Sequence, residues 1–382
     1  MKQSSFVLGK NMGLAILLIL SILVPVAMAA GVGGNEPPTW ELKVIDDSAY
    51  YSIHPSLVLG KNGVAHISYS DGTGRIRHAE MKDGRWAVET AASTWGTMTS
   101  AMALDALGNP AIAYGDGMSY GNLMYANSSG RGWRQEFVDN GCFLLGNVGH
   151  MSSLAFDSKG APHIVYNNGN HFAILQYATR KEAAWDTMVI DGGLVILGDT
   201  GYDPALVMDH LDEPIIAYRD GKHYASLRIA RRNISGTWEI TEVDNGGWFA
   251  DTGYMPSLAL DMSGNPHISY YDKDNKALRY ASWDGTQWIL ECVDSKGNVG
   301  KYSSLVIDSH NQPYISYYDE TNYSLRFATM DPATRKWLYW TVDSEKVGLG
   351  TSLALDPLGH PSIAYYDLEN HAMKYAGWTG LG

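Results

Sequence analysis

The pentapeptide "SLALD" runs from Ser257 to Asp261 and recurs unchanged from Ser352 to Asp356. Seven versions of this segment occur in the chain, and all have a large apolar second residue: Leu57, Met102, Leu154, Leu206, Leu258, Leu305 and Leu353. Successive versions lie 45, 52, 52, 52, 47 and 48 residues apart. Self-similarity with a period of about 40–50 residues is typical of β-propellers and related repeat proteins.

Each repeat contains four strand-like pieces, as the fifth repeat illustrates. The pentapeptide is almost wholly apolar, as expected of a strand that is buried on both faces. An alternating strand from His267 to Tyr270 follows, then Ala277 to Ala281, and then a fourth strand from Trp288 to Asp294. Four short strands in each of seven repeats predict an all-β fold, a seven-bladed β-propeller with four antiparallel strands per blade.

The two ends of the chain complement each other. The seventh repeat stops after its third strand, near Trp378, whereas a segment from Trp40 to Asp46 has the pattern of a fourth strand. Pairing these segments in one sheet would remove two free strand edges. We therefore predict that the N-terminal strand closes the last blade, and that residues 30–382 form one propeller domain, which we expect to be monomeric.

Residues 1–29 have a different composition. Lys2 and Lys10 precede an apolar run from Met12 to Val26, and Ala27-Met28-Ala29 provides a small-x-small cleavage site. This pattern predicts a signal peptide and a secreted protein, extracellular or periplasmic, with no membrane association after cleavage. An uncleaved anchor is the alternative, but the run is short compared with the roughly 20 residues that span a bilayer.

The formal net charge is −13 at pH 7. Nucleic acid is therefore excluded as a partner, because phosphate binding requires a basic surface. With only two cysteines, the domain must be stabilised by burial and not by a disulfide framework.

The repeat separates structural residues from candidate functional ones. His66, His163 and His267 share one position of the second strand, so we interpret them as packing residues. The same interpretation applies to the cations of one third-strand position: Arg77, Arg228, Arg279, Arg326 and Lys374.

Departures from the repeat cluster in blades 3 to 5. From the Asp that ends a fourth strand to the next first-strand Leu, the loops entering these blades count 15, 15 and 14 residues, against 11, 11 and 10 elsewhere. In a propeller these loops lie at one mouth of the channel. They contain Trp248 and Phe249, and four residues share one position beside the channel: His150, Tyr202, Tyr254 and Lys301.

The ends of the second strands depart in the same blades. Blade 3 has Asn167-Asn168 in place of the usual ending, and His171 follows, although His371 occupies the matching position of blade 7. Blade 4 has Arg219 between a scaffold Tyr and Asp. A guanidinium at a channel mouth requires an anionic partner, which is either Asp203 or Asp220 of the protein or a ligand.

Histidine, tyrosine, arginine and asparagine around one cleft suit β-elimination on a uronic acid. This reaction removes the proton α to a carboxylate and expels the glycosidic oxygen. Arg219, helped by Asn168, can neutralise the carboxylate, while neutral His and Tyr can exchange protons. We expect neither a metal nor another cofactor in this chemistry.

The ordered set His150, His171, Tyr202, Arg219 and Tyr254 resembles the active site of the ulvan lyases, which are seven-bladed propeller polysaccharide lyases. The resemblance implies that His150 and Tyr202 act in proton transfer and that Arg219 binds the uronate carboxylate. It gives His171 and Tyr254 supporting roles.

Two other classes remain open. A non-catalytic propeller could bind a glycan or a protein, with Trp248 and Phe249 stacking on sugar faces and Lys301 contacting the ligand. A hydrolase of the sialidase type needs several arginines at the mouth, where the sequence offers Arg219 alone. The sequence therefore favours a secreted lyase for a uronic-acid polysaccharide over a binding module.

Overall fold

The computed structural model describes residues 37–50, 54–94, 96, 99–117, 121–130, 132–140, 148–169, 173–182, 184–192, 200–221, 225–233, 235–247 and 250–381, apart from the side chains of residues 150 and 381. Within these ranges the chain forms twenty-eight β-strands and no helix, so none of the described chain is a helix that could cross a membrane. The predicted leader, residues 1–29, lies outside the described residues.

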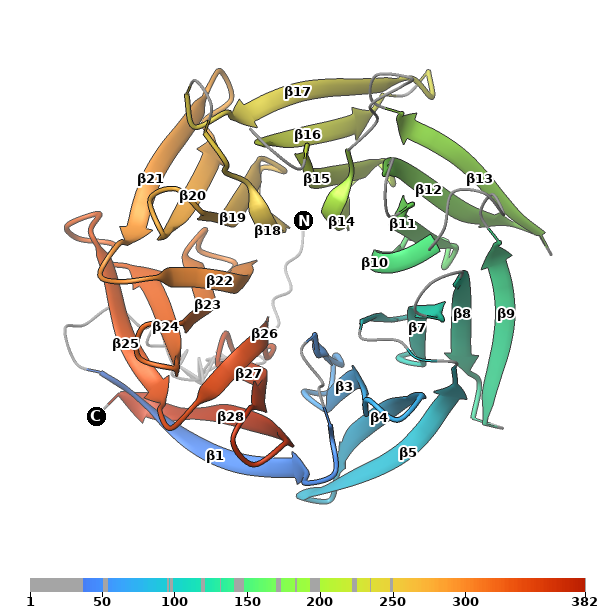
Figure 1. Ribbon diagram of the computed structural model, residues 1–382, viewed down its shortest axis with the longest axis horizontal. Helices are drawn as coiled ribbons and strands as arrows, with labels where there is room; N and C mark the ends of the chain where they lie inside the picture. Colours follow the sequence, from blue (N-terminus) through green and yellow to red (C-terminus); the bar gives the residue numbers. More distant parts are fainter. Residues whose placement is uncertain are drawn as a thin grey trace, which may run out of the picture. The chain divides into compact units, whose positions relative to one another are not determined.

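The strands form seven antiparallel sheets of four, which confirms the predicted seven-bladed β-propeller. Figure 1 shows the sheets as blades around a central axis, with first strands such as β14, β18 and β22 innermost. Blade 1 comprises β2 (Ser56–Leu59), β3 (Ala65–Ser70), β4 (Arg75–Lys82) and β5 (Arg85–Ser93). Blade 2 comprises β6 (Ser100–Leu104), β7 (Pro110–Asp116), β8 (Asn122–Ser128) and β9 (Trp133–Asp139). Blade 3 comprises β10 (Val148–Phe156), β11 (Pro162–Asn168), β12 (Ile174–Lys181) and β13 (Ala184–Asp191). Blade 4 comprises β14 (Tyr202–Met208), β15 (Pro214–Asp220), β16 (Ser226–Arg232) and β17 (Trp238–Asp244). Blade 5 comprises β18 (Tyr254–Leu260), β19 (Pro266–Asp272), β20 (Ala277–Trp283) and β21 (Trp288–Asp294). Blade 6 comprises β22 (Val299–Ile307), β23 (Pro313–Asp319), β24 (Ser324–Met330) and β25 (Trp337–Asp343).

Blade 7 is built from both ends of the chain, as predicted. Its first three strands are β26 (Val347–Leu355), β27 (Pro361–Asp367) and β28 (Ala372–Leu381), and β1 (Pro38–Asp46) pairs with β28 as the fourth. Trp40 lies opposite Trp378 in this antiparallel ladder. The exchange gives blade 7 the same four strands as the other blades and covers the outer edge of β28.

The recurring serine of the "SLALD" segment links neighbouring blades around the channel. Its Oγ accepts a hydrogen bond from the backbone N–H of the apolar residue in the next blade, at 2.9–3.1 Å, in five cases: Ser56 with Met102, Ser153 with Leu206, Ser257 with Leu305, Ser304 with Leu353, and Ser352 with Leu57. Blades 2 and 4 have Ala101 and Ala205 instead. The sequence signature that reveals the repeat therefore also joins the blades.

A second seam joins the blades farther from the axis. In six cases the Asp that ends a fourth strand accepts a hydrogen bond from a second-strand tyrosine of the next blade: Tyr69 to Asp46, Tyr166 to Asp139, Tyr218 to Asp191, Tyr270 to Asp244, Tyr317 to Asp294, and Tyr365 to Asp343. Arg326 adds ion pairs to Asp294 at 2.8 Å and Asp319 at 2.7 Å. Hydrogen bonds to a charged group contribute about 1.5–3 kcal/mol each. The third-strand cations are thus part of the scaffold, as interpreted from the repeat.

Candidate functional site at the channel mouth

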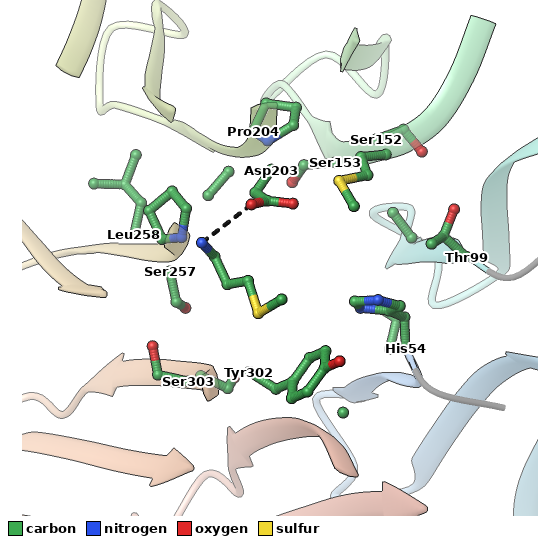
Figure 2. Close-up of a pocket in the computed structure, with 18 of the residues that line it drawn as sticks. His54, Thr99, Ser152, Ser153, Asp203, Pro204, Ser257, Leu258, Tyr302 and Ser303 are labelled. Carbon is green, nitrogen blue, oxygen red and sulfur yellow. Dashed lines mark hydrogen bonds between the residues drawn. The ribbon is translucent and has the colours of Figure 1, made fainter. Parts of the chain in front are cut away.

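The first strands line a central cavity of about 290 Å³. Figure 2 shows His54 and Tyr302 directed into it, with Asp203 opposite them. The His54 and Tyr302 rings lie 5.3 Å apart, and Asp203 accepts a hydrogen bond from the backbone N–H of Met255 at 3.2 Å. Asp203, Met255 and Tyr302 each have a positive φ, near 50°, at equivalent positions. In blades 4, 5 and 6 this conformation turns one residue toward the channel.

Tyr254 and Lys301, two of the predicted site residues, directly precede the channel-lining residues Met255 and Tyr302. A glycine directly before each of them fixes the position of its side chain. Gly253, before Tyr254, has a φ of 80°, and a Cβ there would lie 2.8 Å from the backbone nitrogen of Leu227 in the preceding blade. Gly300 packs in the same way on Leu278. Only glycine fits so close an approach at a left-handed backbone position. The side chains of Tyr254 and Lys301 are therefore held at matching places, beside the preceding blade.

Arg219 lies on β15 and contacts tyrosines from two blades. It is the register partner of Tyr202 on β14, and its guanidinium carbon is 5.3 Å from the centre of that ring. The same carbon lies 3.7 Å from the ring of Tyr254 in the next blade, and Nη2 donates a hydrogen bond to the Tyr254 hydroxyl at 2.9 Å. Arg219 is only 5% exposed. Cation–π contacts of this kind are strengthened by removal from water.

Two charged residues complete the group around Tyr254. Asp251 lies 3.6 Å from Arg219 Nη2, and Lys273 Nζ lies closer to it, at 2.6 Å. The Tyr254 hydroxyl donates to Asp251 at 2.9 Å and accepts from Lys273 at 3.1 Å. We call Arg219, Asp251, Tyr254 and Lys273 the blade 4–5 junction.

The protonation states follow from these contacts. Burial alone would raise the pKa of Asp251, but hydrogen bonds from Lys273 and Tyr254 outweigh it and hold that pKa below its usual value. The hydrogen bond to Asp251 raises the pKa of Lys273 to about 12. Burial raises the pKa of Tyr254 against the opposing effect of the two cations, so its phenol is protonated at neutral pH. The four side chains together carry two positive charges and one negative charge.

The next junction has the same plan with different residues. Tyr271 occupies the position of Arg219, and Asn298, Lys301 and Glu320 occupy those of Asp251, Tyr254 and Lys273. The Tyr271 hydroxyl donates to Asn298 at 2.6 Å, and Lys301 pairs with Glu320 at 2.7 Å. This blade 5–6 junction is neutral, since its one cation faces one carboxylate.

Three of the five predicted site residues with described side chains lie together, and the other two lie elsewhere. Tyr202, Arg219 and Tyr254 lie together. Lys301 is at the neighbouring junction, paired with Glu320. Asn168 ends β11 and donates to Gln176 of β12, in the place where Asp220 pairs with Arg228 in blade 4. The contact of Asn168 is thus a neutral version of a scaffold ion pair.

The other predicted site residues cannot be placed in the same way. His171, Trp248 and Phe249 lie outside the described residues, and His150 is described only as a backbone position on β10 (Val148–Phe156).

Of the two carboxylates suggested for Arg219, Asp220 pairs with Arg228 at 2.7 Å, and Asp203 accepts the N–H of Met255.

Asp251 and Lys273 were missed in the sequence, although signals for both existed. Asp251 begins the tetrapeptide Asp-Thr-Gly-Tyr at 251–254, which also occurs at 199–202, just before the two tyrosines that contact Arg219. Lys273 directly follows the Asp that ends a second strand, a position where blades 1 to 4 have glycine. Comparing these two positions among the blades would have identified both residues.

Comparisons with known proteins support the fold. No family model matches the sequence, and no curated protein matches it. Among solved structures, an ulvan lyase bound to a glucuronic acid–sulfated rhamnose unit has a TM-score of 0.60 at 14% identity, covering 91% of this chain and 96% of its own. A lectin from Burkholderia pseudomallei has a TM-score of 0.60 at 13% identity, covering 87% and 100%. The Aleuria aurantia lectin in complex with Fucα1-6GlcNAc has a TM-score of 0.53 at 12% identity, covering 77% and 97%.

These identities are low, so the likeness establishes the propeller fold alone. The similar structures include a polysaccharide lyase and lectins.

Proposed function

We propose that this protein is a secreted polysaccharide lyase that cleaves a uronic-acid-containing polymer by metal-independent β-elimination at the blade 4–5 junction. The observation that carries the proposal is Arg219, a buried guanidinium held between two tyrosines at the mouth of an acidic protein. Among the seam cations of the scaffold, Arg228, Arg326 and Lys374 each lie against two carboxylates. Asp251, in contrast, divides its charge between Arg219 and Lys273.

The net charge of the junction suits a substrate carboxylate. With two cations and one carboxylate, one further negative charge would balance the group. A uronate carboxylate beside Arg219 would be neutralised, which lowers the cost of the enolate-like dianion that forms when the α proton leaves. Lys273 is half exposed and would contribute to attraction at the surface of the junction.

The reaction then needs one base and one acid. The base takes the proton from C5 of the uronate, the C–H electrons form the C4=C5 double bond, and the C4–O4 bond breaks. O4 leaves with a proton from the acid. We assign proton transfer to His150 and Tyr202, with His171 and Tyr254 in support. Tyr254 is hydrogen-bonded to both Arg219 and Asp251, so it positions the guanidinium.

Asn168, Trp248, Phe249 and Lys301 remain predicted contacts to the sugar chain. In the sequence they belong to blades 3 to 6, so a polymer that contacts all of them would extend over several blades. The ion pair of Lys301 with Glu320 suits a contact to sugar hydroxyls better than one to a second carboxylate.

A non-catalytic glycan-binding propeller is the second candidate. Its support is that a lectin and a lyase resemble this chain equally well, each with a TM-score of 0.60. Such a protein would use the same tyrosines and Arg219 to hold an acidic sugar without cleaving it.

Ultraviolet absorbance separates the candidates, because β-elimination creates an unsaturated uronate. The protein without residues 1–29 would be screened against ulvan, glucuronan, xanthan-type polymers and glycosaminoglycans. We expect absorbance to rise with one of them and Arg219→Ala to abolish the rise. Arg228→Ala is the matched control, because Arg228 pairs with Asp220 in the scaffold and should affect stability only.

Two results would count against the lyase. Binding of a polymer without any gain in absorbance would favour the lectin-like role. Equal turnover by Arg219→Ala and Arg228→Ala would exclude the assignment of Arg219.

A further inference from the structure

Blade 1 departs from the repeat at a place far from the channel mouth. In blades 3 and 5 the second-strand histidine contacts a tyrosine on the third strand: His163 with Tyr177, and His267 with Tyr280. In blade 1 the histidine is His66, and the tyrosine is replaced by His78. Glu80 replaces the threonine or serine found two residues after the tyrosine, at Thr179 and Ser282.

A third change removes the acid that accompanies the histidine in other blades. His163 Nε2 lies 3.5 Å from Asp157, and His267 Nε2 lies 3.7 Å from Asp261. Blade 1 has Gly60 at the matching position. The carboxylate near the histidine is thus supplied by Glu80 of the third strand instead of by the turn after the first strand.

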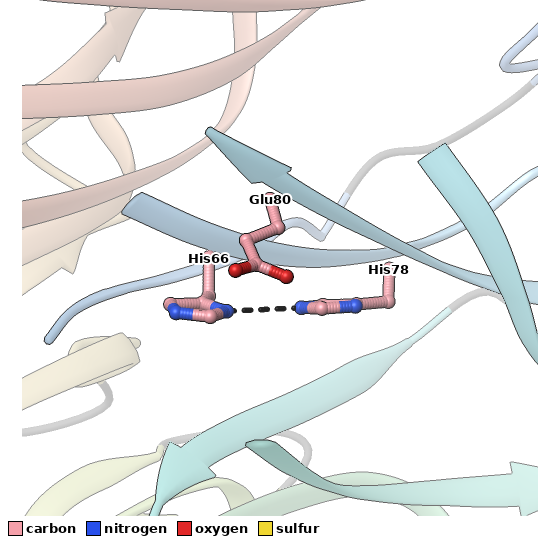
Figure 3. A group of neighbouring side chains, drawn as sticks. All are labelled: His66, His78 and Glu80. Carbon is pink, nitrogen blue, oxygen red and sulfur yellow. Dashed lines mark hydrogen bonds between the residues drawn. The ribbon is translucent and has the colours of Figure 1, made fainter. Parts of the chain in front are cut away.

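The side chains of His66, His78 and Glu80 converge on one point. His66 Nδ1 and His78 Nε2 lie 3.1 Å apart, and a carboxylate oxygen of Glu80 lies within 4.8 Å of both. Figure 3 shows the two ring nitrogens facing each other, with the Glu80 carboxylate beside the line that joins them. His66 is 7% exposed and His78 is 2% exposed. Two imidazoles on one tetrahedral zinc ion have nitrogens about 3.3 Å apart, because each Zn–N bond is about 2.0–2.1 Å.

A further carboxylate orients the second ring. His78 Nδ1 lies 3.1 Å from Glu89 on β5, and the same Glu89 oxygen accepts a hydrogen bond from Trp133 Nε1 at 2.9 Å. A proton on Nδ1 that is donated to Glu89 leaves the Nε2 lone pair directed at His66 and Glu80. Carboxylate–histidine pairs of this kind commonly orient metal-bound histidines.

We propose that His66, His78 and Glu80 bind one divalent transition-metal cation, with zinc as the first candidate. Two imidazoles and a carboxylate form a ligand set that zinc, cobalt and nickel accept, and three protein ligands leave a position for water. Lys82 pairs with one Glu80 oxygen at 2.8 Å, but the carboxylate has a second oxygen for the metal. His66 lies near the start of β3 and Glu80 near the end of β4, away from the strand ends that form the mouth. The metal therefore links β3 to β4 and takes no part in the proposed lyase reaction.

The test is metal binding by the propeller prepared without a polyhistidine tag and stripped with a chelator. Calorimetry with Zn²⁺ and the visible absorption of Co²⁺ should each give one saturable site, and Zn²⁺ should raise the unfolding temperature. His78→Tyr should lose this site and its thermal shift, while the fold is kept, because tyrosine is the residue of blades 3 and 5. Glu89→Gln should weaken binding about 10- to 100-fold through the orientation of His78.

Two further variants keep the result decisive. Glu80→Thr replaces a half-buried residue by the one found in blade 3, and it should also weaken metal binding. It provides the same test if His78→Tyr does not fold. His267→Gln changes the matching histidine of blade 5 and should leave metal binding unchanged. No saturable binding by the stripped protein, or equal binding by wild type, His78→Tyr and Glu80→Thr, would overturn the proposal.

Discussion

The blade 4–5 and blade 5–6 junctions occupy equivalent positions but differ in charge. Arg219, Asp251, Tyr254 and Lys273 form the first, with a net positive charge, whereas Tyr271, Asn298, Lys301 and Glu320 form the second, which is neutral. Both use the same glycine turn against the preceding blade, but the hydrogen bond toward the next blade differs: Arg219 donates to Tyr254, whereas Tyr271 donates to Asn298. The scaffold therefore sets the positions, and substitution at a few of them determines the net charge of a junction.

The neighbouring junction also provides substitutions that the fold already accepts. Tyrosine stands at the Arg219 position in blades 5, 6 and 7, as Tyr271, Tyr318 and Tyr366. Each residue of the blade 4–5 junction can thus be replaced by its counterpart, with little risk of unfolding the protein.

Arg219→Tyr should have the largest effect. It replaces the guanidinium by the residue of the neutral junction, so cleavage of the uronate polymer should fall about 10²–10³-fold, the usual effect of losing one stabilising donor in an active site. The rate of ultraviolet absorbance gain measures this effect, and thermal unfolding checks that the fold is kept. An active Arg219→Tyr variant would remove the distinction between the junctions.

Lys273→Glu should have the next largest effect. It introduces the counterpart of Glu320, which leaves two carboxylates with one guanidinium at the junction. We expect KM to rise about tenfold or more, because like charges repel at a binding surface, with a smaller change in kcat. Initial rates over a range of polymer concentrations separate the two constants. The exposed pair Lys346 and Glu369 offers a control, since Lys346→Glu at the blade 6–7 boundary should leave KM unchanged.

Tyr254→Phe should have a moderate effect. It removes the hydroxyl that bonds Arg219, Asp251 and Lys273 while keeping the ring against the guanidinium. A lost hydrogen bond to a charged group corresponds to about 1.5–3 kcal/mol, so kcat/KM should fall by a factor of about 10–100. The matched change Tyr271→Phe should leave kcat/KM nearly unaltered. Equal losses in the two variants would indicate a general effect on packing.

Asp251→Asn should have the smallest effect, and it concerns stability as a function of pH. The pKa of Asp251 is lower in the folded protein than its usual 3.8, so its ionised form stabilises the fold above that pH. This contribution is lost as the pH falls from about 4 through the folded-state pKa. Denaturant unfolding at several pH values should therefore show the stability of wild type and Asp251→Asn converging on acidification. A constant difference would contradict the pKa shift.

Much of the fold could be predicted because its signals are local and repeated. The serine of "SLALD" recurs in five blades, where it accepts a hydrogen bond from the next blade, and the Trp40–Asp46 segment carries the complete pattern of a fourth strand. The prediction of strand exchange at the ring closure followed from that pattern together with the missing fourth strand of the seventh repeat, and the pairing of β1 with β28 confirms it.

The candidate site was predicted only in part, for a physical reason. Arg219, Tyr202 and Tyr254 break the pattern of strand positions, so subtraction of the repeat revealed them. Asp251 lies in a loop of variable length, where alignment of the blades is least certain, and its role depends on contacts with Lys273 from another loop. The repeat likewise concealed blade 1, where His66 matches its counterparts while Gly60, His78 and Glu80 around it differ.

The central claim is that Arg219 holds a uronate carboxylate, and a comparison of two ligands tests it most directly. The affinity of the protein for the polymer it cleaves or binds would be measured beside that for the same polymer with its carboxyl groups reduced to alcohols. We predict that wild type prefers the uronate form at least about tenfold, as expected for a charge-assisted hydrogen bond, and that Arg219→Tyr shows no preference. An equal preference in both proteins would contradict the claim and leave Arg219 as a scaffold partner of Asp251.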